Sequence, residues 1–300
     1  MTAWENLNIP FNSQETLRTV HESLDHLLNY FSLRAGVFYT GNICGLHDFE
    51  RDHTHGHLHL IKNGPVQLLE SGQPAITILQ PTLLFLPRPE KHRLLANDRT
   101  GADVVCASIV LGNSVHQPIS DSLPDRVLIA LDQIAGIDAI LAWMFEEAFE
   151  NRSGRQAILD KLCEILIIRM LRYCLEQGVI AGGTLAGLAD PQLSKALEAI
   201  HQNPELDWTV AVLATRAGMS RARFADRFHQ VVGKPPADYL TSFRIMLAQR
   251  LLARGRPVKA VALDVGYGSS SALHHAFVRK IGISPSDWLT AQSDIHKNKK

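Results

Sequence analysis

The chain has 300 residues, of which 46% are hydrophobic and 20% are charged, with equal numbers of basic and acidic side chains. This composition is ordinary for a globular protein, and no apolar run approaches the roughly 18 residues that a membrane span needs. Four scattered cysteines outside CxxC pairs argue against a zinc knuckle or a disulfide framework. The first residues lack the pattern of a secretion signal, so we expect a cytoplasmic protein with no membrane partner.

The balanced net charge hides an uneven distribution along the chain. Residues 188–300 contain 16 Lys and Arg against 9 Asp and Glu, whereas the remainder contains 14 against 21. A basic C-terminal third on an acidic body indicates that this end meets a polyanion.

The predicted elements change character several times along the chain. Residues 15–34 have apolar side chains at helical spacing and predict a helix. Over 35–111, short apolar runs separated by Gly, Pro, Asn and Asp predict a β-sandwich or barrel. Helical periodicity returns over 125–178, and the small, Gly-rich stretch 178–191 is the best candidate for a linker. From 191 to 289 the pattern predicts short helices joined by tight turns.

One helical stretch, 158–171, carries an apolar stripe that is longer than a connector needs. We interpret it as the contact surface of a homodimer, because a dimer would double the contacts with the polyanion that the basic end meets. The alternative is that part of the stripe covers the barrel of the same chain.

A helix-turn-helix pattern begins at Thr209, which is suited to cap its first helix. Gly218 permits a sharp turn, and Ser220 can cap the second helix, which can enter the major groove of DNA. Phe224 marks the core side of this second helix, and Arg227 flanks that side within reach of a phosphate.

The same pattern recurs over 256–282, with a Gly-Tyr-Gly turn and Ser269 as the cap of its second helix. Between the two patterns lies a predicted helix of about 17 residues, or ~25 Å at 1.5 Å per residue. Such a spacer could hold two DNA-reading helices near the ~34 Å that separates successive major-groove faces.

These residues resemble the AraC/XylS family of bacterial transcription regulators. The resemblance rests on A-x-x-A-G-M-S (214–220), P-x-x-Y-L-x-x-x-R-x-x-x-A-x-x-L-L (236–252) and the run from V-G-Y to S-P (265–285). It implies that base-reading positions fall on Ala222, Ala225, Asp226, Ser270, Ser271, His274 and His275. From their places on the two second helices, away from the core side, we expect Arg221, Arg223 and Arg279 to contact DNA as well. Asp226 stands where the family often has arginine, and His274–His275 stand where it often has Ser-Arg, so the operator sequence stays open.

The N-terminal half resembles the cupin-type sensor domain of such regulators, through HLHLIKNG (57–64), LLFLPRPEKHRL (83–94) and VVCASIVLG (104–112). This resemblance implies a β-barrel with an internal ligand pocket. When the metal-binding motifs of catalytic cupins are laid on the sequence, His53, His57 and His92 fall on ligand positions, while the carboxylate is missing. His55 or His59 could supply a further imidazole, because alternate residues of a strand share a face.

Three interpretations of the histidines remain open: a divalent transition metal, an organic effector without metal, and no small ligand. Cys106 sits in a predicted core strand, where a free cysteine is most often a small hydrophobic residue. An oxidant-sensing thiol there would need exposure and a lowered pKa.

The sequence therefore predicts an α+β multidomain protein that is not an enzyme. We expect a cupin-like effector-sensing domain over 1–120, a helical connector and linker over 121–187, a DNA-binding domain over 188–292 and a basic tail over 293–300. The expected function is sequence-specific regulation of transcription at a double-stranded DNA operator, under the control of a small effector or metal. RNA polymerase would be a partner if the protein is an activator. The alternative is a metal-dependent cupin enzyme with an incidental helical domain.

Overall fold

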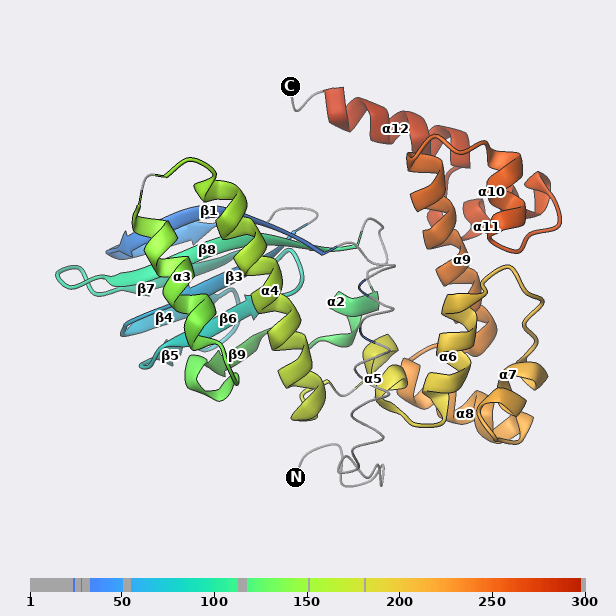
Figure 1. The fold of residues 1–300 in the computed structure, drawn as a ribbon, viewed down its shortest axis with the longest axis horizontal. Coiled ribbons are helices and arrows are strands. Elements are labelled where there is room, and N and C mark those ends of the chain that lie inside the picture. Colours follow the sequence, from blue (N-terminus) through green and yellow to red (C-terminus); the bar gives the residue numbers. More distant parts are fainter. Residues whose placement is uncertain are drawn as a thin grey trace. The chain divides into compact units, whose positions relative to one another are not determined.

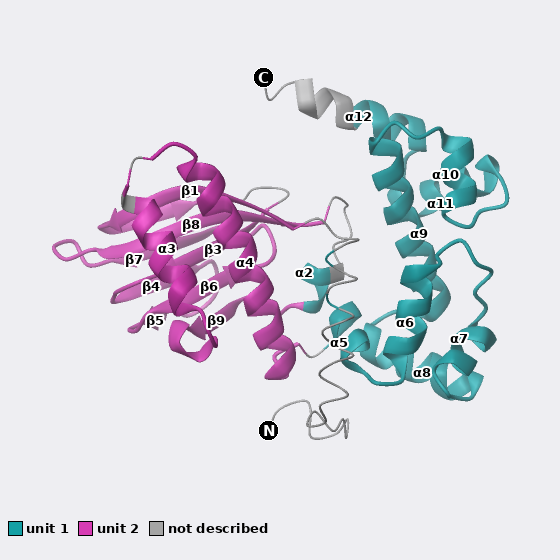
Figure 2. Cartoon of the chain, in the orientation of Figure 1, with its two compact units in different colours: residues 1–31, 113–122, 181–300 teal, residues 32–112, 123–180 magenta. Residues whose placement is uncertain are grey.

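The structure is a computed structural model of the chain (Figure 1). It describes residues 24, 28, 33–50, 55–112, 118–150, 152–180 and 182–297. The helix predicted over 15–34 lies almost entirely outside these residues, and its last two positions belong to a strand. The chain forms two compact units, one with residues 32–112 and 123–180 and the other with the rest (Figure 2).

The first unit is built on two antiparallel sheets. One sheet has the strand order β1-β8-β3-β6-β9, and the other has the order β2-β7-β4-β5. The strands of the five-stranded sheet are β1 (Leu33–Ile43), β3 (Gly56–Ile61), β6 (Thr82–Leu86), β8 (Ala102–Leu111) and β9 (Val127–Ala130). Those of the four-stranded sheet are β2 (Gly45–Phe49), β4 (Val66–Glu70), β5 (Ile76–Ile78) and β7 (His92–Ala96).

A single apolar core joins the inner faces of the two sheets. Ile61, Leu84 and Cys106 from one sheet and Leu68 and Leu94 from the other are all buried in it. The sequence prediction of a sheet-rich N-terminal half is therefore confirmed. The sheets stay separate in the described residues, so this half is a sandwich and not a closed barrel.

Two helices, α3 (Asp138–Phe149) and α4 (Arg155–Glu176), pack against the outer face of the five-stranded sheet beside β1 (Figure 1). The apolar stripe predicted over 158–171 is buried, with Leu159, Leu166 and Met170 all at 0% exposure. It covers the sheet of its own chain, which was the alternative interpretation. The start of the stretch predicted as helical forms β9, because a four-residue apolar run satisfies helix and strand patterns equally.

The second unit is helical. After the short α2 (Pro118–Ser122) it contains α5 (Gly183–Ala189), α6 (Leu193–Gln202), α7 (Val210–Arg216), α8 (Arg221–Val232), α9 (Pro236–Ala253), α10 (Val258–Asp264), α11 (Ser270–Ile281) and α12 (Pro285–Lys297). The three predicted caps are present, since Thr209, Ser220 and Ser269 each accept a hydrogen bond from a backbone N–H three residues on. Each satisfies a donor that would otherwise have no partner at the helix start.

The Gly-rich stretch interpreted as a linker forms α5, in which residues 184–189 are all buried. Its glycines serve close packing: a Cβ at Gly187 would lie 2.8 Å from side-chain atoms of Leu197 and Val232. None of the helices in the described part of the chain is long and apolar enough to span a membrane.

Candidate functional site

The first helix-turn-helix comprises α7 and α8, joined by a turn at Gly218 with a positive φ of 64°. Phe224 and Phe228 of α8 are completely buried and fix the side of the helix that faces the core. The predicted DNA-contacting residues lie on the other side. Arg221, Ala222, Arg223 and Asp226 are exposed, and Ala225 is half-buried.

The second helix-turn-helix comprises α10 and α11, with its turn at Gly266. Leu273 and Phe277 are buried at 0% exposure. Ser271, His274, His275 and Arg279 are exposed, and Ser270 is half-buried at the start of the helix.

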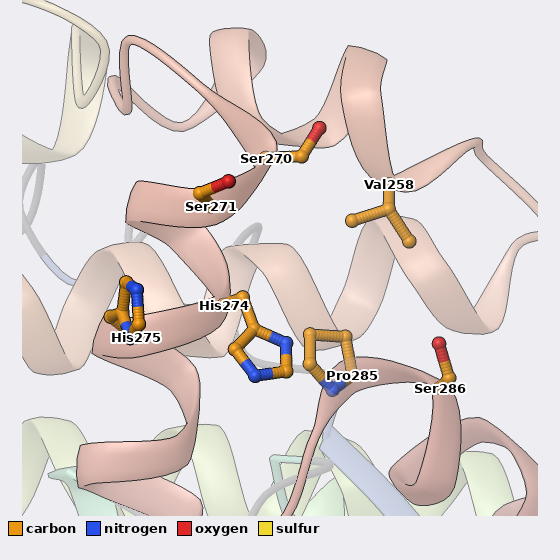
Figure 3. Close-up of a pocket in the computed structure, with 7 residues that line it drawn as sticks. All are labelled: Val258, Ser270, Ser271, His274, His275, Pro285 and Ser286. Carbon is orange, nitrogen blue, oxygen red and sulfur yellow. The ribbon is translucent and has the colours of Figure 1, made fainter.

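A surface pocket of about 300 Å³ brings four of these residues together (Figure 3). It is lined by Val258, Ser270, Ser271, His274, His275, Pro285 and Ser286, from the first turns of α10 and α12 and the first two turns of α11. In Figure 3 the imidazole of His274 lies beside Pro285, so this part of the surface offers hydroxyl and imidazole groups together.

Arg227 does not fit the interpretation that it reaches a phosphate. Its Nη2 atom lies 2.6 Å from Oδ2 of Asp190, whose side chain is fully buried. The other carboxylate oxygen of Asp190 accepts hydrogen bonds from the backbone N–H groups of Gln192 and Leu193 at the start of α6. Arg227 therefore pairs with a buried carboxylate of the same unit and helps to hold α8 in place.

The second candidate site is a cluster of imidazoles between the two sheets. His57 and His59 occupy alternate positions of β3, and His92 begins β7. All three side chains are buried. His53, the third predicted metal ligand, lies outside the described residues.

Hydrogen bonds in this cluster run in one direction. His92 Nδ1 lies 3.0 Å from the carbonyl oxygen of Glu90, which can only accept, so this nitrogen carries a proton. In a neutral ring, His92 Nε2 then accepts, and the donor is His59 Nε2 at 2.7 Å. His59 Nδ1 is left as an acceptor, and the thiol of Cys106 donates to it at 3.0 Å. The result is a linear series of three hydrogen bonds between neutral groups, from Cys106 through His59 and His92 to the carbonyl oxygen of Glu90.

The electrostatics favour the same protonation states. Burial, reinforced by the neighbouring histidines, lowers the pKa of His59 well below its usual value. Burial also lowers the pKa of His92 to about 4, although the bond to Glu90 opposes this shift. Burial raises the pKa of Cys106, so its sulfur stays a thiol and lacks the lowered pKa that an oxidant-sensing cysteine needs.

Two aromatic rings complete the cluster. The Phe49 ring stacks on His92 with ring centres 5.1 Å apart and meets the edge of His59 at 4.5 Å. Phe38 contacts His57 at 5.9 Å and is 51% exposed, so it lies at the outer limit of the cluster. The sequence analysis missed both phenylalanines, because aromatic residues in strands ordinarily serve only packing.

The imidazoles of the described cluster do not form a ready site for a metal ion. The ring centres of His57, His59 and His92 lie 4.9, 5.1 and 6.1 Å apart. Three imidazoles around one tetrahedral ion, with bonds of about 2.0–2.1 Å, would have centres about 5 Å apart. Among the described residues no three His, Cys, Asp or Glu side chains are arranged to hold an ion. The contact between His59 and His92 would have to open to admit one.

Comparison with known proteins gives the family. Residues 22–176 match a cupin family, and residues 213–291 match a helix-turn-helix domain family. Fold and site together thus define a cupin domain followed by a DNA-binding double helix-turn-helix. The chain belongs to the AraC family of transcriptional regulators, in the group with an N-terminal cupin domain.

Two curated relatives and one solved structure illustrate the similarity. A putative AraC-like transcription regulator of Streptomyces antibioticus is 45% identical over 133 residues, which cover 44% of this chain and 44% of that protein. An uncharacterized HTH-type transcriptional regulator of Haemophilus influenzae is 29% identical over 81% of this chain and 89% of its own length. The DNA-binding domain of AdpA, solved with a target DNA, is 34% identical, covers 34% of this chain and 92% of that chain, and has a TM-score of 0.33.

The buried imidazoles predict a stability that depends on pH. An unfolded histidine has a pKa of about 6.5, so below that pH the unfolded chain takes up a proton that the folded His92 refuses. The free energy of unfolding should therefore fall as the pH drops from about 6.5 to about 4. At about 1.4 kcal/mol per pKa unit, His92 alone accounts for about 3 kcal/mol.

Urea unfolding of the full chain, in a chelator and between pH 7.5 and 4.5, measures this dependence. His92→Gln, whose amide oxygen can still accept from His59, should flatten the profile. Leu94→Ala, which opens a cavity on the same strand without removing an ionisable group, should lower the stability and keep the slope. A wild-type stability that does not change below pH 6.5 would contradict the neutral cluster.

Proposed function

We propose that the protein is a sequence-specific DNA-binding regulator of transcription, controlled by a small effector or metal ion that its cupin domain senses. The observation that carries the proposal is the pair of recognition helices, α8 and α11, whose predicted contact residues face outward from fully buried aromatic anchors. In this proposal residues 188–292 bind the operator, 1–120 sense the effector, 121–187 connect and dimerise, and 293–300 form a basic tail. The protein works in the cytoplasm, and RNA polymerase is a partner if it activates.

In this proposal the outward-facing side chains of the recognition helices have two different roles. The arginines Arg221, Arg223 and Arg279 contact phosphates and position the protein. The shorter side chains read base edges: Ala222, Ala225 and Asp226 on α8, and Ser270, Ser271, His274 and His275 on α11. Asp226 can accept from the N4 amino group of cytosine but repels phosphate, so α8 would favour a cytosine there.

Arginine and serine substitutions should affect DNA binding in different ways. Arg279→Ala should weaken binding to all sequences and reduce the salt dependence by about one counterion, because one phosphate contact is lost. Ser271→Ala should change the preferred base at one position, with a discrimination of about 1–3 kcal/mol. Lys195→Ala, an exposed basic residue on α6, is the matched control and should change neither.

Fluorescence anisotropy with genomic fragments recovered by the full chain, at several salt concentrations, measures both effects. An Arg279→Ala protein whose affinity and salt slope equal those of Lys195→Ala would contradict the assignment of α11 to DNA.

We further propose that the effector is sensed at the imidazole cluster. Its support is the burial of three imidazoles beside a partly exposed aromatic ring, an arrangement that packing of the sandwich alone does not require. A transition-metal ion, if it is the effector, would be held by His57 and His92 together with His53, which lies outside the described residues, because such an ion suits imidazole ligands. The relatives are named as transcription regulators, which favours an effector-sensing role of the cupin domain over the alternative of a metal-dependent enzyme.

The double substitution His57→Ala and His92→Ala should abolish the transcriptional response of a reporter while leaving affinity for the operator unchanged. His47→Ala, on the neighbouring strand β2, is the control and should respond like wild type. Elemental analysis of the purified proteins distinguishes the effectors. One equivalent of a transition metal in wild type and none in the double variant indicates a metal, whereas none in either indicates an organic effector. A normal response from the double variant would show that the cluster is not the sensor.

The proposed homodimer needs a surface other than the predicted stripe, since that stripe covers β1. The outward sides of α3 and α4 offer one, because Trp143 is 66%, Ile158 45% and Ile165 44% exposed. Ile158 and Ile165 are two helical turns apart and therefore share a face. A second copy of the chain would bury these side chains through a symmetric contact.

Ile158→Glu combined with Ile165→Glu should convert the dimer to a monomer, because two carboxylates would have to be buried without partners. Leu79→Glu changes an equally apolar residue that is 76% exposed elsewhere in the same unit, and it should remain dimeric. Light scattering at tens of micromolar measures both. A wild-type protein that is monomeric with and without DNA would refute the dimer.

A further inference from the structure

The short helix α2 belongs to one unit by sequence and to the other by packing. It lies between β8 and β9, two strands of the five-stranded sheet. Yet α2 (118–122) groups with the helical unit, where it packs against α5 (Figure 2). Its side chains Ile119 and Ser122 are buried there, at 0% and 5% exposure.

The contact between α2 and α5 is specific in its geometry. The cap position of α5 is Gly182, which has no side chain to accept from the first turn. Ser122 of α2 supplies that acceptor, because its Oγ accepts from the N–H of Leu185 at 3.2 Å. A Cβ at Gly183, whose φ is +82°, would lie 2.3 Å from Ser122 Oγ and 2.8 Å from its Cα. Only glycine therefore permits this close approach.

From α5 the packing continues to the first recognition helix. Gly187 of α5 lies against Val232 at the end of α8. Asp190, at the C-terminal end of α5, is fully buried and paired with Arg227 of α8. A shift of α5 would therefore disturb both a close apolar contact and a buried ion pair of α8.

On its other side, α2 is tied by a short described segment to β9, a strand of the sheet that carries two histidines of the imidazole cluster. Four residues separate Ser122 from Val127, the start of β9, and a fully extended residue spans at most about 3.6 Å. β9 pairs with β6, which pairs with β3 and its two histidines.

We propose that α2 is the coupling element between the two units: its contact with α5 transmits a displacement of β9 to the recognition helix α8. This inference rests on the proposed function for the meaning of the signal, but the coupling itself is a physical property that can be measured without DNA or effector.

Hydrogen–deuterium exchange of the full-length protein tests the contact. Gly183→Ala should accelerate exchange in 183–189 and 221–232 by about fivefold or more, the size expected when an N-cap bond is lost. Exchange in α10 and α11 should not change. Gly72→Ala is the matched control, because Gly72 also has a positive φ of 73° but has no atom within 4 Å of the added Cβ. Equal effects of the two variants on α8, or an effect confined to 183–189, would overturn the proposal.

A second variant tests transmission without disturbing the contact. Insertion of Gly-Ser-Gly-Ser between the exposed residues Pro124 and Asp125 lengthens the connection to β9 and leaves Ser122 in place. In the wild-type background, His92→Ala should alter exchange in 221–232, and with the insertion this effect should fall by at least half. An undiminished effect of His92→Ala on α8 would overturn the role of α2. Because no DNA is present, this outcome is independent of whether the proposed function is correct.

Discussion

The DNA-binding half depends on one arginine of the central helix α9. Arg244 donates hydrogen bonds to the carbonyl oxygens of Pro204 and Leu206, in the segment that leads into α7. The same guanidinium lies over the ring of Tyr267 and against Gly266, in the turn of the second helix-turn-helix. One side chain thus joins both helix-turn-helix motifs to α9, so their relative position is set by a rigid helix.

Packing along α9 strengthens this constraint. Tyr239 and Phe243, near its start, are buried, and Tyr239 shares a 2.7 Å hydrogen bond with His201 of α6. Further along, Leu247 and Leu252 are also buried, and α10, α11 and α12 pack on the helix. With 18 residues, α9 is about 27 Å long at 1.5 Å per residue. A helix of this length, anchored at both ends, fixes a separation that a flexible linker would leave free.

Local signals made the helix-turn-helix motifs predictable from the sequence. Caps at Thr209, Ser220 and Ser269 and a glycine in each turn act within four residues, so a sequence pattern reveals them. Non-local causes escaped prediction. The sequence pattern places Arg227 within reach of a phosphate, because its actual partner, Asp190, is 37 residues away and no local signal reveals it. The glycines of α5 suggest a linker, whereas in the structure they permit close contact with Ser122 and Val232. His59 could have been found, since it alternates with His57 on one strand, but its bond to Cys106 could not.

We propose that α9 holds α8 and α11 at a fixed spacing, near the ~34 Å that separates successive major-groove faces of DNA. Hydroxyl-radical footprinting of the full chain on a recovered operator, with 5 or 10 base pairs inserted between the two protected grooves, tests this most directly. A rigid spacer predicts that both insertions eliminate one of the two protections, because 5 base pairs turn the second groove to the opposite face and 10 move it about 34 Å away. Protection of both grooves that persists through either insertion would show that the two motifs move independently, and would contradict the claim.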